Sequence, residues 1–176
     1  MEQTTPMLKQ YLEIKAKHPH TILFFRLGDF YEMFGEDARQ GSGILDVVLT
    51  SRDAGKSGRI PMCGIPYHAA ETYIAKLIKA GLKVALCEQL EDPALAKGIV
   101  KRDVIRIITA GTYIDEANFE SRQIISIAAV NNSFGIAFTD TASGIIQTNE
   151  YPSLTPIAEI IAKMNAYECI FAEQTQ

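Results

Sequence analysis

The stretch GDFYEMF at residues 28–34 decides how the surrounding chain folds. It follows a mostly apolar run at residues 21–27, and two such segments joined by turn-forming residues predict a β-hairpin. Gly28 and Asp29 form the predicted turn, because a two-residue hairpin loop favours glycine in its first central position. Residues 30–34 are therefore expected to form the second arm of the hairpin.

This second arm breaks the pattern of a half-buried strand. Side chains alternate between the two faces of a strand, so Phe30, Glu32 and Phe34 share one face. If that face is core, Glu32 is a buried carboxylate without an evident partner, which is costly. If it is exposed, Phe30 presents a large aromatic ring to solvent. Either arrangement calls for a functional explanation.

Phe30 and Glu32 have two interpretations. In the first, the hairpin covers another element and Glu32 lies at the rim of that contact. In the second, the ring stacks on a planar ligand while the carboxylate hydrogen-bonds the edge of that ligand. On duplex DNA, aromatic side chains wedged between base steps from the minor groove unstack and kink the duplex. The residues by themselves leave both interpretations open.

Composition indicates a globular protein of one domain, or of one and a half small domains. The chain has 176 residues, of which 47% are apolar. No run approaches the ~18 consecutive apolar residues of a membrane helix, and the N-terminus lacks the features of a signal peptide. We therefore expect a cytoplasmic protein with no membrane partner. Three widely spaced cysteines argue against a disulfide framework and against a Cys-x-x-Cys metal site.

Charge is distributed unevenly along the chain. The net charge is −4, but residues 1–122 carry 16 basic and 16 acidic side chains. Residues 123–176 carry Lys163 against five carboxylates, so the acidity belongs to the last third. A polyanion site is therefore expected in the first two thirds of the chain.

The first 109 residues alternate helical and strand patterns, which indicates an α/β domain with a mixed sheet. Thr5 and Pro6 begin a predicted helix that ends before His18, since threonine is a good N-cap and proline suits the first helical position. Further helices are expected at residues 36–45 and 73–80. Strands are expected at 46–50, 82–88 and 104–109, a polar loop at 51–59, and an extended segment that is not a central strand at 60–67.

The last third of the chain reads differently. A polar, irregular segment leads into three strand-like runs, a helix beginning at Thr155 or Pro156, and a final strand at 169–172. A β-β-β-α-β piece of this size would be marginal by itself. We therefore predict the truncated beginning of a second domain.

Cys63 and His68 are candidates for enzyme chemistry, either as nucleophile and base of a hydrolase or as metal ligands. A metal site needs three or four ligands, and no other cysteine or histidine lies nearby in the sequence. A cysteine in an apolar segment is more often a small buried residue. A nuclease-like enzyme in the second domain is a further alternative, although Asp140 is the only acidic residue on the predicted strands of its meander.

Basic residues cluster in two places in the first domain. Glycine-rich loops with lysine and arginine suit contacts to the phosphate backbone, which position a protein on a duplex. The candidates for DNA-backbone contact are Arg52, Lys56, Arg59, Lys101, Arg102 and Arg106.

Several separated blocks of the sequence resemble the MutS family of bacterial DNA mismatch repair proteins. The first is GDFYEMF with Glu36-Asp37-Ala38, and the second is IPMCGIPYHA at residues 60–69. The third is VALCEQ at residues 84–89 with Asp92-Pro93. Residues 4–11 and 101–108 extend the match, which is collinear over residues 5–125 and highly specific.

The resemblance implies a division into domains. Residues 1–115 would be the mismatch-recognition domain, 116–123 a linker, and 124–176 the N-terminal part of a connector domain with an inactive ribonuclease H-like fold. The ATPase part of the family is absent here, so this chain is not expected to be an enzyme or to hold a cofactor. ATP and Mg²⁺ are expected in the C-terminal domain of the full-length family.

The resemblance also implies roles for the two residues of the hairpin. Phe30 would wedge into the minor groove and stack on the mispaired base, and Glu32 would hydrogen-bond that base. The implied partners are double-stranded DNA with a mismatch or small loop, a second copy in the full-length homodimer, and a MutL-type repair protein. Gly41 and Gly43 stand where the family has better helix formers, a departure that concerns the scaffold.

Overall fold

A computed structural model describes residues 4–55, 58–114, 121–131 and 133–171. The chain divides into two compact units, Met1–Ile108 and Thr109–Gln176, and each is described by itself. Residues 116–120 of the predicted linker lie outside the described residues, and Gln123 already begins a strand. Among the described residues, no helix is both long enough and apolar enough to cross a membrane.

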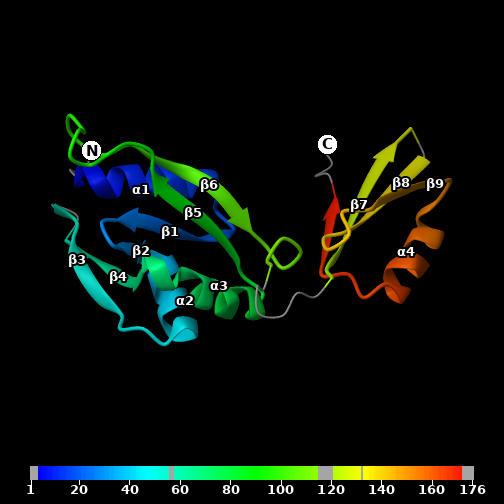
Figure 1. Cartoon of the computed structure of the whole chain (residues 1–176), viewed down its shortest axis with the longest axis horizontal. Helices are drawn as coiled ribbons and strands as arrows, with labels where there is room; N and C mark the ends of the chain where they lie inside the picture. The colour runs from blue at the N-terminus through cyan, green and yellow to red at the C-terminus, as the bar shows by residue number, and fades with distance from the viewer. Residues whose placement is uncertain (1–3, 56–57, 115–120, 132, 172–176) are drawn as a thin grey trace. The chain divides into compact units, whose positions relative to one another are not determined.

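The first unit is a six-stranded mixed sheet with helices packed on it, as the α/β pattern predicts (Figure 1). The strand order is β3-β4-β2-β1-β5-β6, in which β1 and β5 are parallel and the other neighbours are antiparallel. Its elements are α1 (Pro6–Lys17), β1 (Thr21–Leu27), β2 (Phe30–Phe34), α2 (Gly35–Leu45), β3 (Thr50–Asp53), β4 (Arg59–Pro66), α3 (Ala70–Lys79), β5 (Lys83–Gln89) and β6 (Arg102–Ile108).

The hairpin and the first helix form as their local signals predict. Thr5 caps α1 by accepting a hydrogen bond from the backbone N–H of Leu8. Leu27 pairs with Phe30 across the two-residue turn, and Gly28 takes a φ of +59°. A positive φ costs glycine less than any other residue, which is why the turn favours glycine at this position.

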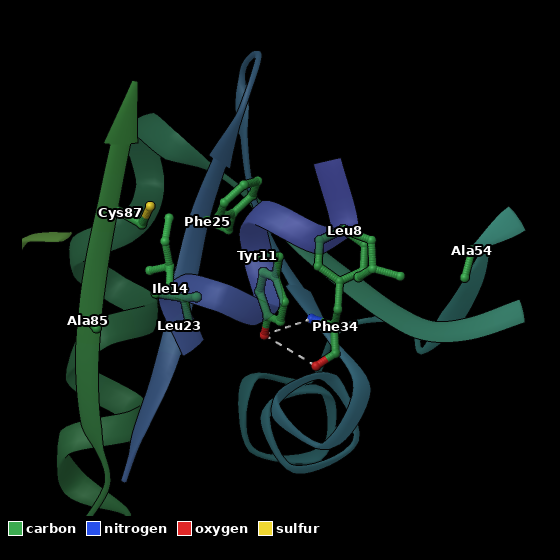
Figure 2. Packing of buried hydrophobic residues seen from close by; sticks show 9 residues of the cluster. All are labelled: Leu8, Tyr11, Ile14, Leu23, Phe25, Phe34, Ala54, Ala85 and Cys87. Atoms are coloured by element: carbon green, nitrogen blue, oxygen red, sulfur yellow. Dashed lines mark hydrogen bonds between the residues drawn. The ribbon is translucent and has the colours of Figure 1, made fainter. Parts of the chain in front are cut away.

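The two faces of the sheet are covered by different helices. On one face, Leu8, Tyr11 and Ile14 of α1 pack against strand residues such as Phe25 and Phe34 (Figure 2). The Tyr11 ring meets both phenylalanine rings edge-on, with centroids 5.5 and 4.9 Å away. On the other face, α2 and α3 cover the strand side chains that alternate with these, such as Met33 and Cys63 beneath α2. The sheet is therefore buried from both sides around its middle.

The region between α2 and β4 differs from the prediction. Residues 46–49 are not in a strand: Asp46 takes a left-handed conformation that ends α2, and Val48 is 83% exposed. The strand is β3, which begins only at Thr50 and continues into the segment predicted as a loop. The segment predicted to lie outside the sheet is β4, an interior strand. It tolerates two prolines because Pro61 and Pro66 lie near its ends, opposite Ser51 and Phe30.

Gly41 has a packing role that its helix propensity does not reveal. A Cβ atom at this position would lie 3.0 Å from Sδ of Met33, which is fully buried in β2. Gly41 therefore lets α2 approach the sheet closely. Gly43, two residues later on the exposed side of the helix, meets nothing within 4 Å.

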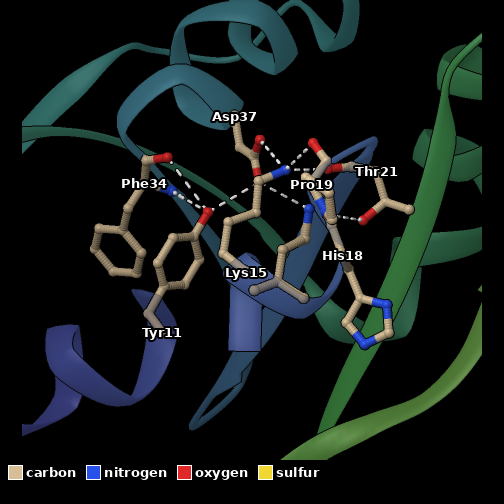
Figure 3. Close-up of polar contacts among 8 residues, drawn as sticks. Tyr11, Lys15, His18, Pro19, Thr21, Phe34 and Asp37 are labelled. Atoms are coloured by element: carbon tan, nitrogen blue, oxygen red, sulfur yellow. Dashed lines mark hydrogen bonds and ion pairs between the residues drawn. The ribbon is translucent and has the colours of Figure 1, made fainter. Parts of the chain in front are cut away.

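A buried polar cluster joins α1, α2 and β1 (Figure 3). The carboxylate of Asp37 accepts hydrogen bonds from the Tyr11 hydroxyl at 3.0 Å and from the backbone N–H of Leu23 at 3.0 Å. It also pairs with Nζ of Lys15 at 2.8 Å. Burial, followed by the charge of Asp37, raises the pKa of Tyr11, so the phenol stays neutral and donates.

The second unit contains a four-stranded sheet in the order β10-β7-β8-β9. Its elements are β7 (Gln123–Val130), β8 (Ser133–Asp140), β9 (Ile146–Tyr151), α4 (Leu154–Lys163) and β10 (Glu168–Phe171). The β-β-β-α-β order is the one predicted from the sequence. Ile157 of α4 packs on Ile125 and Ile136 to form a small core. Identification of this unit with a connector domain stays a prediction.

Candidate nucleic-acid interface

Phe30 is the exposed residue of an otherwise well-packed strand. It opens β2 directly after the hairpin turn, and 47% of its surface is accessible. Tyr31, Met33 and Phe34 of the same strand are buried. A large aromatic ring at the open end of a rigid strand is available to stack on a ligand.

Gly64 lies beside Phe30 and Glu32 on the neighbouring strand. It pairs with Glu32, and a Cβ at this position would lie 3.9 Å from Cδ1 of Phe30 and 3.6 Å from Cγ of Glu32. The aromatic ring and the stem of the carboxylate therefore flank a stretch of bare backbone. They stand next to each other at the sheet surface as one site.

Glu32 has a partner that the sequence did not reveal. Its Oε2 accepts a hydrogen bond from Nη1 of Arg52 at 2.8 Å, while 16% of the Glu32 side chain and 41% of the Arg52 side chain remain exposed. Burial raises the pKa of Glu32, and the charge of Arg52 opposes that rise. The carboxylate is thus partly desolvated and balanced by one arginine.

The hairpin turn is braced by two residues that sequence analysis missed. Nε of Arg26 donates to the carbonyl of Gly28 at 2.6 Å, and the backbone N–H of Tyr67 donates to the carbonyl of Asp29 at 3.0 Å. The Arg26 guanidinium also stacks on the Tyr67 ring, 3.5 Å from its centroid. Both peptide units of the turn are therefore held by groups outside it.

Glu88 completes this brace. It accepts a hydrogen bond from the Tyr31 hydroxyl and lies 3.8 Å from the Arg26 guanidinium. Arg26 pairs with Tyr31 across the hairpin, so these side chains lie on the face opposite Phe30. A charged residue within an apolar strand run was the available sequence signal for Arg26.

The predicted basic residues do not gather on one face. Arg52 pairs with Ile60, which packs beside α1, so it shares the face of Phe30. Arg59 has the opposite parity in β4 and donates to Oγ and the carbonyl of Ser51. Arg106 pairs with Leu86, which pairs with Phe24, and this places it on the α2–α3 face. The structure therefore places Arg52 at the Phe30–Glu32 site and the other two arginines on the opposite face of the sheet.

Lys101 and Lys56 complete the loop candidates. Lys101 is exposed just before β6, where its backbone N–H donates to Glu91. Lys56 lies outside the described residues. Contacts of Lys101, Arg59 and Arg106 with DNA stay predictions.

The prediction for Arg102 is wrong. This residue is 8% exposed, and its guanidinium donates to the carbonyls of Arg26 and Val100 and to Oε1 of Gln10. It also lies 5.0 Å from the centroid of the Phe25 ring. The charge is buried and satisfied by fixed acceptors, so Arg102 is not available to a phosphate.

Cys63 and His68 do not form a hydrolase site. Cys63 is 1% exposed, and its thiol faces the carbonyl of Ala38 in α2. Burial, followed by the charge of Asp37, raises its pKa to about 11, so the nucleophilic thiolate is scarce. His68 is exposed, with its ring packed edge-on against Tyr67. The predicted alternative of a Cys63/His68 enzyme is therefore contradicted.

Asp140, considered for a nuclease-like site, organises its own turn. It accepts hydrogen bonds from Ser121 and from the backbone N–H groups of Ala142 and Ser143, and these bonds, that of Ser121 first, lower its pKa. No group of three or more acidic, cysteine or histidine side chains in the described ranges could hold a metal ion.

Comparison with known proteins identifies the family. Residues 5–117 match the family model described as MutS domain I. The DNA mismatch repair protein MutS of Syntrophobacter fumaroxidans is 46% identical over 181 residues, which covers 100% of this chain and 20% of that protein. MutS of Bacillus subtilis is 54% identical over 143 residues, covering 80% and 17% respectively. The chain thus spans about one fifth of the length of these relatives, and it belongs to the MutS family of DNA mismatch repair proteins.

Proposed function

We propose that the first unit recognises mismatched or unpaired bases in duplex DNA, with Phe30 as the wedge and Glu32 as the polar contact to the displaced base. The observation that carries this proposal is the exposed Phe30 ring at the end of a braced strand, beside a partly desolvated carboxylate. Membership in the MutS family supports the coarser statement that this is a module for mismatch recognition.

The wedge works through the mechanics of DNA. Inserting an aromatic ring between base steps from the minor groove unstacks them and kinks the duplex. Unstacking costs a few kcal/mol, and it costs least where a base is already mispaired. A rigid Phe30 therefore selects sites that deform cheaply, although the minor groove distinguishes base sequences poorly.

Glu32 adds a chemical requirement to this mechanical one. A carboxylate accepts hydrogen bonds through two oxygens, and Arg52 donates to Oε2. Glu32 can therefore accept a hydrogen from the edge of a displaced base. On a duplex that offers no such donor, a desolvated carboxylate near phosphates is unfavourable.

The proposal is tested with a G·T duplex and a matched duplex of the same flanking sequence. NMR titration of the 176-residue chain measures affinities down to the millimolar range, so weak binding is visible. Phe30→Ala should bring the two affinities together and leave the amide spectrum of the remaining sheet unchanged. His68→Ala, which removes an exposed ring beyond β4, is the control and should keep the preference. Equal affinities in the unaltered chain, or a preference that survives Phe30→Ala, would refute the wedge.

The longer protein extends this function. We propose that a full-length protein with this unit forms a homodimer around DNA and hydrolyses ATP with Mg²⁺ in its C-terminal domain. We also propose that it binds a MutL-type partner and acts in the cytoplasm. These proposals rest on membership in the MutS family and concern parts beyond this chain. For the chain itself we propose DNA recognition without catalysis.

A further inference from the structure

We propose that Arg52 exchanges partners during recognition: it leaves Glu32 when a displaced base hydrogen-bonds the carboxylate, and it then binds a DNA phosphate. This inference rests on the proposed function and makes Arg52 a specificity-determining residue. It predicts that mismatched DNA makes one phosphate contact that matched DNA lacks.

The position of Arg52 suits such an exchange. It lies on β3, an edge strand of the sheet, and 41% of its side chain is exposed. Its register places it on the same face as Phe30, so a duplex seated on the wedge meets it. A guanidinium carries five donors in a planar fork that matches phosphate as well as carboxylate.

The energetic coupling comes from the partial burial of Glu32. With 16% of the side chain exposed, the carboxylate needs a donor in both states, since a desolvated charge without a partner is unfavourable. In the free chain that donor is Arg52. A displaced base that donates to Glu32 supplies a second donor, so that Arg52 is no longer required, whereas a stacked and paired base supplies none. Only mismatched DNA therefore releases Arg52 for the backbone.

The contact can be counted through the salt dependence of binding. The logarithm of the association constant falls with the logarithm of salt concentration, with a slope of about 0.9 per neutralised phosphate in B-form DNA. The unaltered chain should show a steeper slope for a G·T duplex than for its matched counterpart. Arg52→Gln should reduce the slope for the G·T duplex by about 0.9 and leave that for the matched duplex unchanged.

Two further variants separate the exchange from simple loss of charge. Arg59→Gln removes an arginine from the same strand pair that lies on the other face and is held by Ser51. It should change both slopes alike and preserve their difference. Glu32→Gln frees Arg52 in advance, so the slope for matched DNA should rise toward that for the G·T duplex, and adding Arg52→Gln should cancel this rise.

The outcomes distinguish this inference from the function on which it rests. An unaltered chain without preference for the G·T duplex refutes the proposed function. A clear preference with slopes that Arg52→Gln lowers equally, or leaves unchanged, refutes the exchange alone. The side-chain Nε–Hε resonance of Arg52 gives an independent readout: it should shift with Glu32→Gln in the absence of DNA and on titration with the G·T duplex. A resonance unmoved by the G·T duplex overturns the exchange.

Discussion

Asp37 and Glu32 are two largely buried carboxylates in one unit, and their surroundings differ in one respect. Asp37 accepts from a tyrosine hydroxyl and a lysine on α1 and from a backbone N–H in β1. For Glu32, the donor found among the described residues is Arg52, a half-exposed side chain. The first carboxylate is enclosed by donors from the fold around it, and the second is paired with a side chain that is 41% exposed.

The difference separates a carboxylate that stabilises the fold from one that is available to a ligand. A buried charge is tolerated when its lone pairs are satisfied by fixed groups, and removing a partner then costs several kcal/mol. A partly exposed ion pair contributes far less to stability. Burial by itself therefore does not assign a role to a carboxylate; the number and rigidity of its donors do.

The largest expected effect is that of Asp37→Asn. It removes the charge that balances Lys15 and weakens acceptance from Tyr11, so we expect a loss of about 3–5 kcal/mol in the free energy of unfolding. Denaturation in urea, followed by circular dichroism, measures it. Glu36→Gln is the matched control one residue earlier, because Glu36 is exposed and pairs only with the surface residue Arg39 at 3.1 Å among its described contacts. The control should change stability by less than about 0.5 kcal/mol. Equal losses for Asp37→Asn and Glu36→Gln would show that Asp37 contributes no more to stability than an exposed carboxylate.

A smaller effect is expected for Glu32→Gln. The pair with Arg52 is partly exposed, so the free energy of unfolding should change by less than about 1 kcal/mol. Loss of stability as large as that of Asp37→Asn would make Glu32 a structural residue and contradict its proposed role.

Titration of Glu32 should make the free energy of unfolding of the unaltered chain depend on pH, and the sign of that dependence is definite. Burial raises the pKa of Glu32 in the folded chain above its ordinary value of 4.5. The protonated form is therefore favoured by folding, and the stability it contributes is present below pH 4.5 and falls as pH rises through the folded pKa. The unaltered chain should lose stability relative to Glu32→Gln as pH increases from that value toward neutrality. Urea titrations at a series of pH values test this, and the opposite trend would mean that Arg52 outweighs burial.

The smallest effects concern how α2, which carries Asp37, is seated on the sheet. Gly43→Ala should stabilise the chain by about 0.5–1 kcal/mol, because alanine is the better helix former and the position is open. Gly41→Ala should yield less or be destabilising, since the added methyl group presses on Met33. Thermal unfolding of the two variants measures the difference in stability. Equal gains in stability would show that the Met33 side chain adjusts to the added methyl group without cost.

Local signals in the sequence were enough for the elements whose ends are set by their own residues. The N-cap at Thr5 and the turn at Gly28 are examples, as are the strand and helix patterns of the second unit. The strand β3 was not predicted correctly because edge strands carry polar residues such as Ser51 and Arg52. The apolar Val48 just before it, which suggested a strand, is exposed. The prediction that residues 60–67 lie outside the sheet was wrong because the sequence does not show that the prolines of β4 lie near the ends of the strand.

Long-range pairing explains what was missed at the site. The position of Phe30 on the same face as Glu32 follows from strand alternation, so it could be predicted from the sequence. The exposure of Phe30 could not, because Phe34 on that same face is buried. Arg52 reaches Glu32 from 20 residues away, and Arg102 is buried through contacts with segments far from it in sequence. A basic cluster in a sequence does not reveal which of its members face solvent, because that depends on strand register and on neighbouring loops.

Bracing of the hairpin turn by Arg26 and Tyr67 lowers the entropic cost of association. Ordering the backbone of one residue costs about 1–2 kcal/mol, and a loop that becomes ordered only on contact weakens binding by that amount. The carbonyls of Gly28 and Asp29 are already held before any ligand arrives. If Phe30 is the wedge that we propose, it meets the duplex on a turn that is already held, and the deformation falls on the DNA, whose stiffness depends on how well its bases are paired.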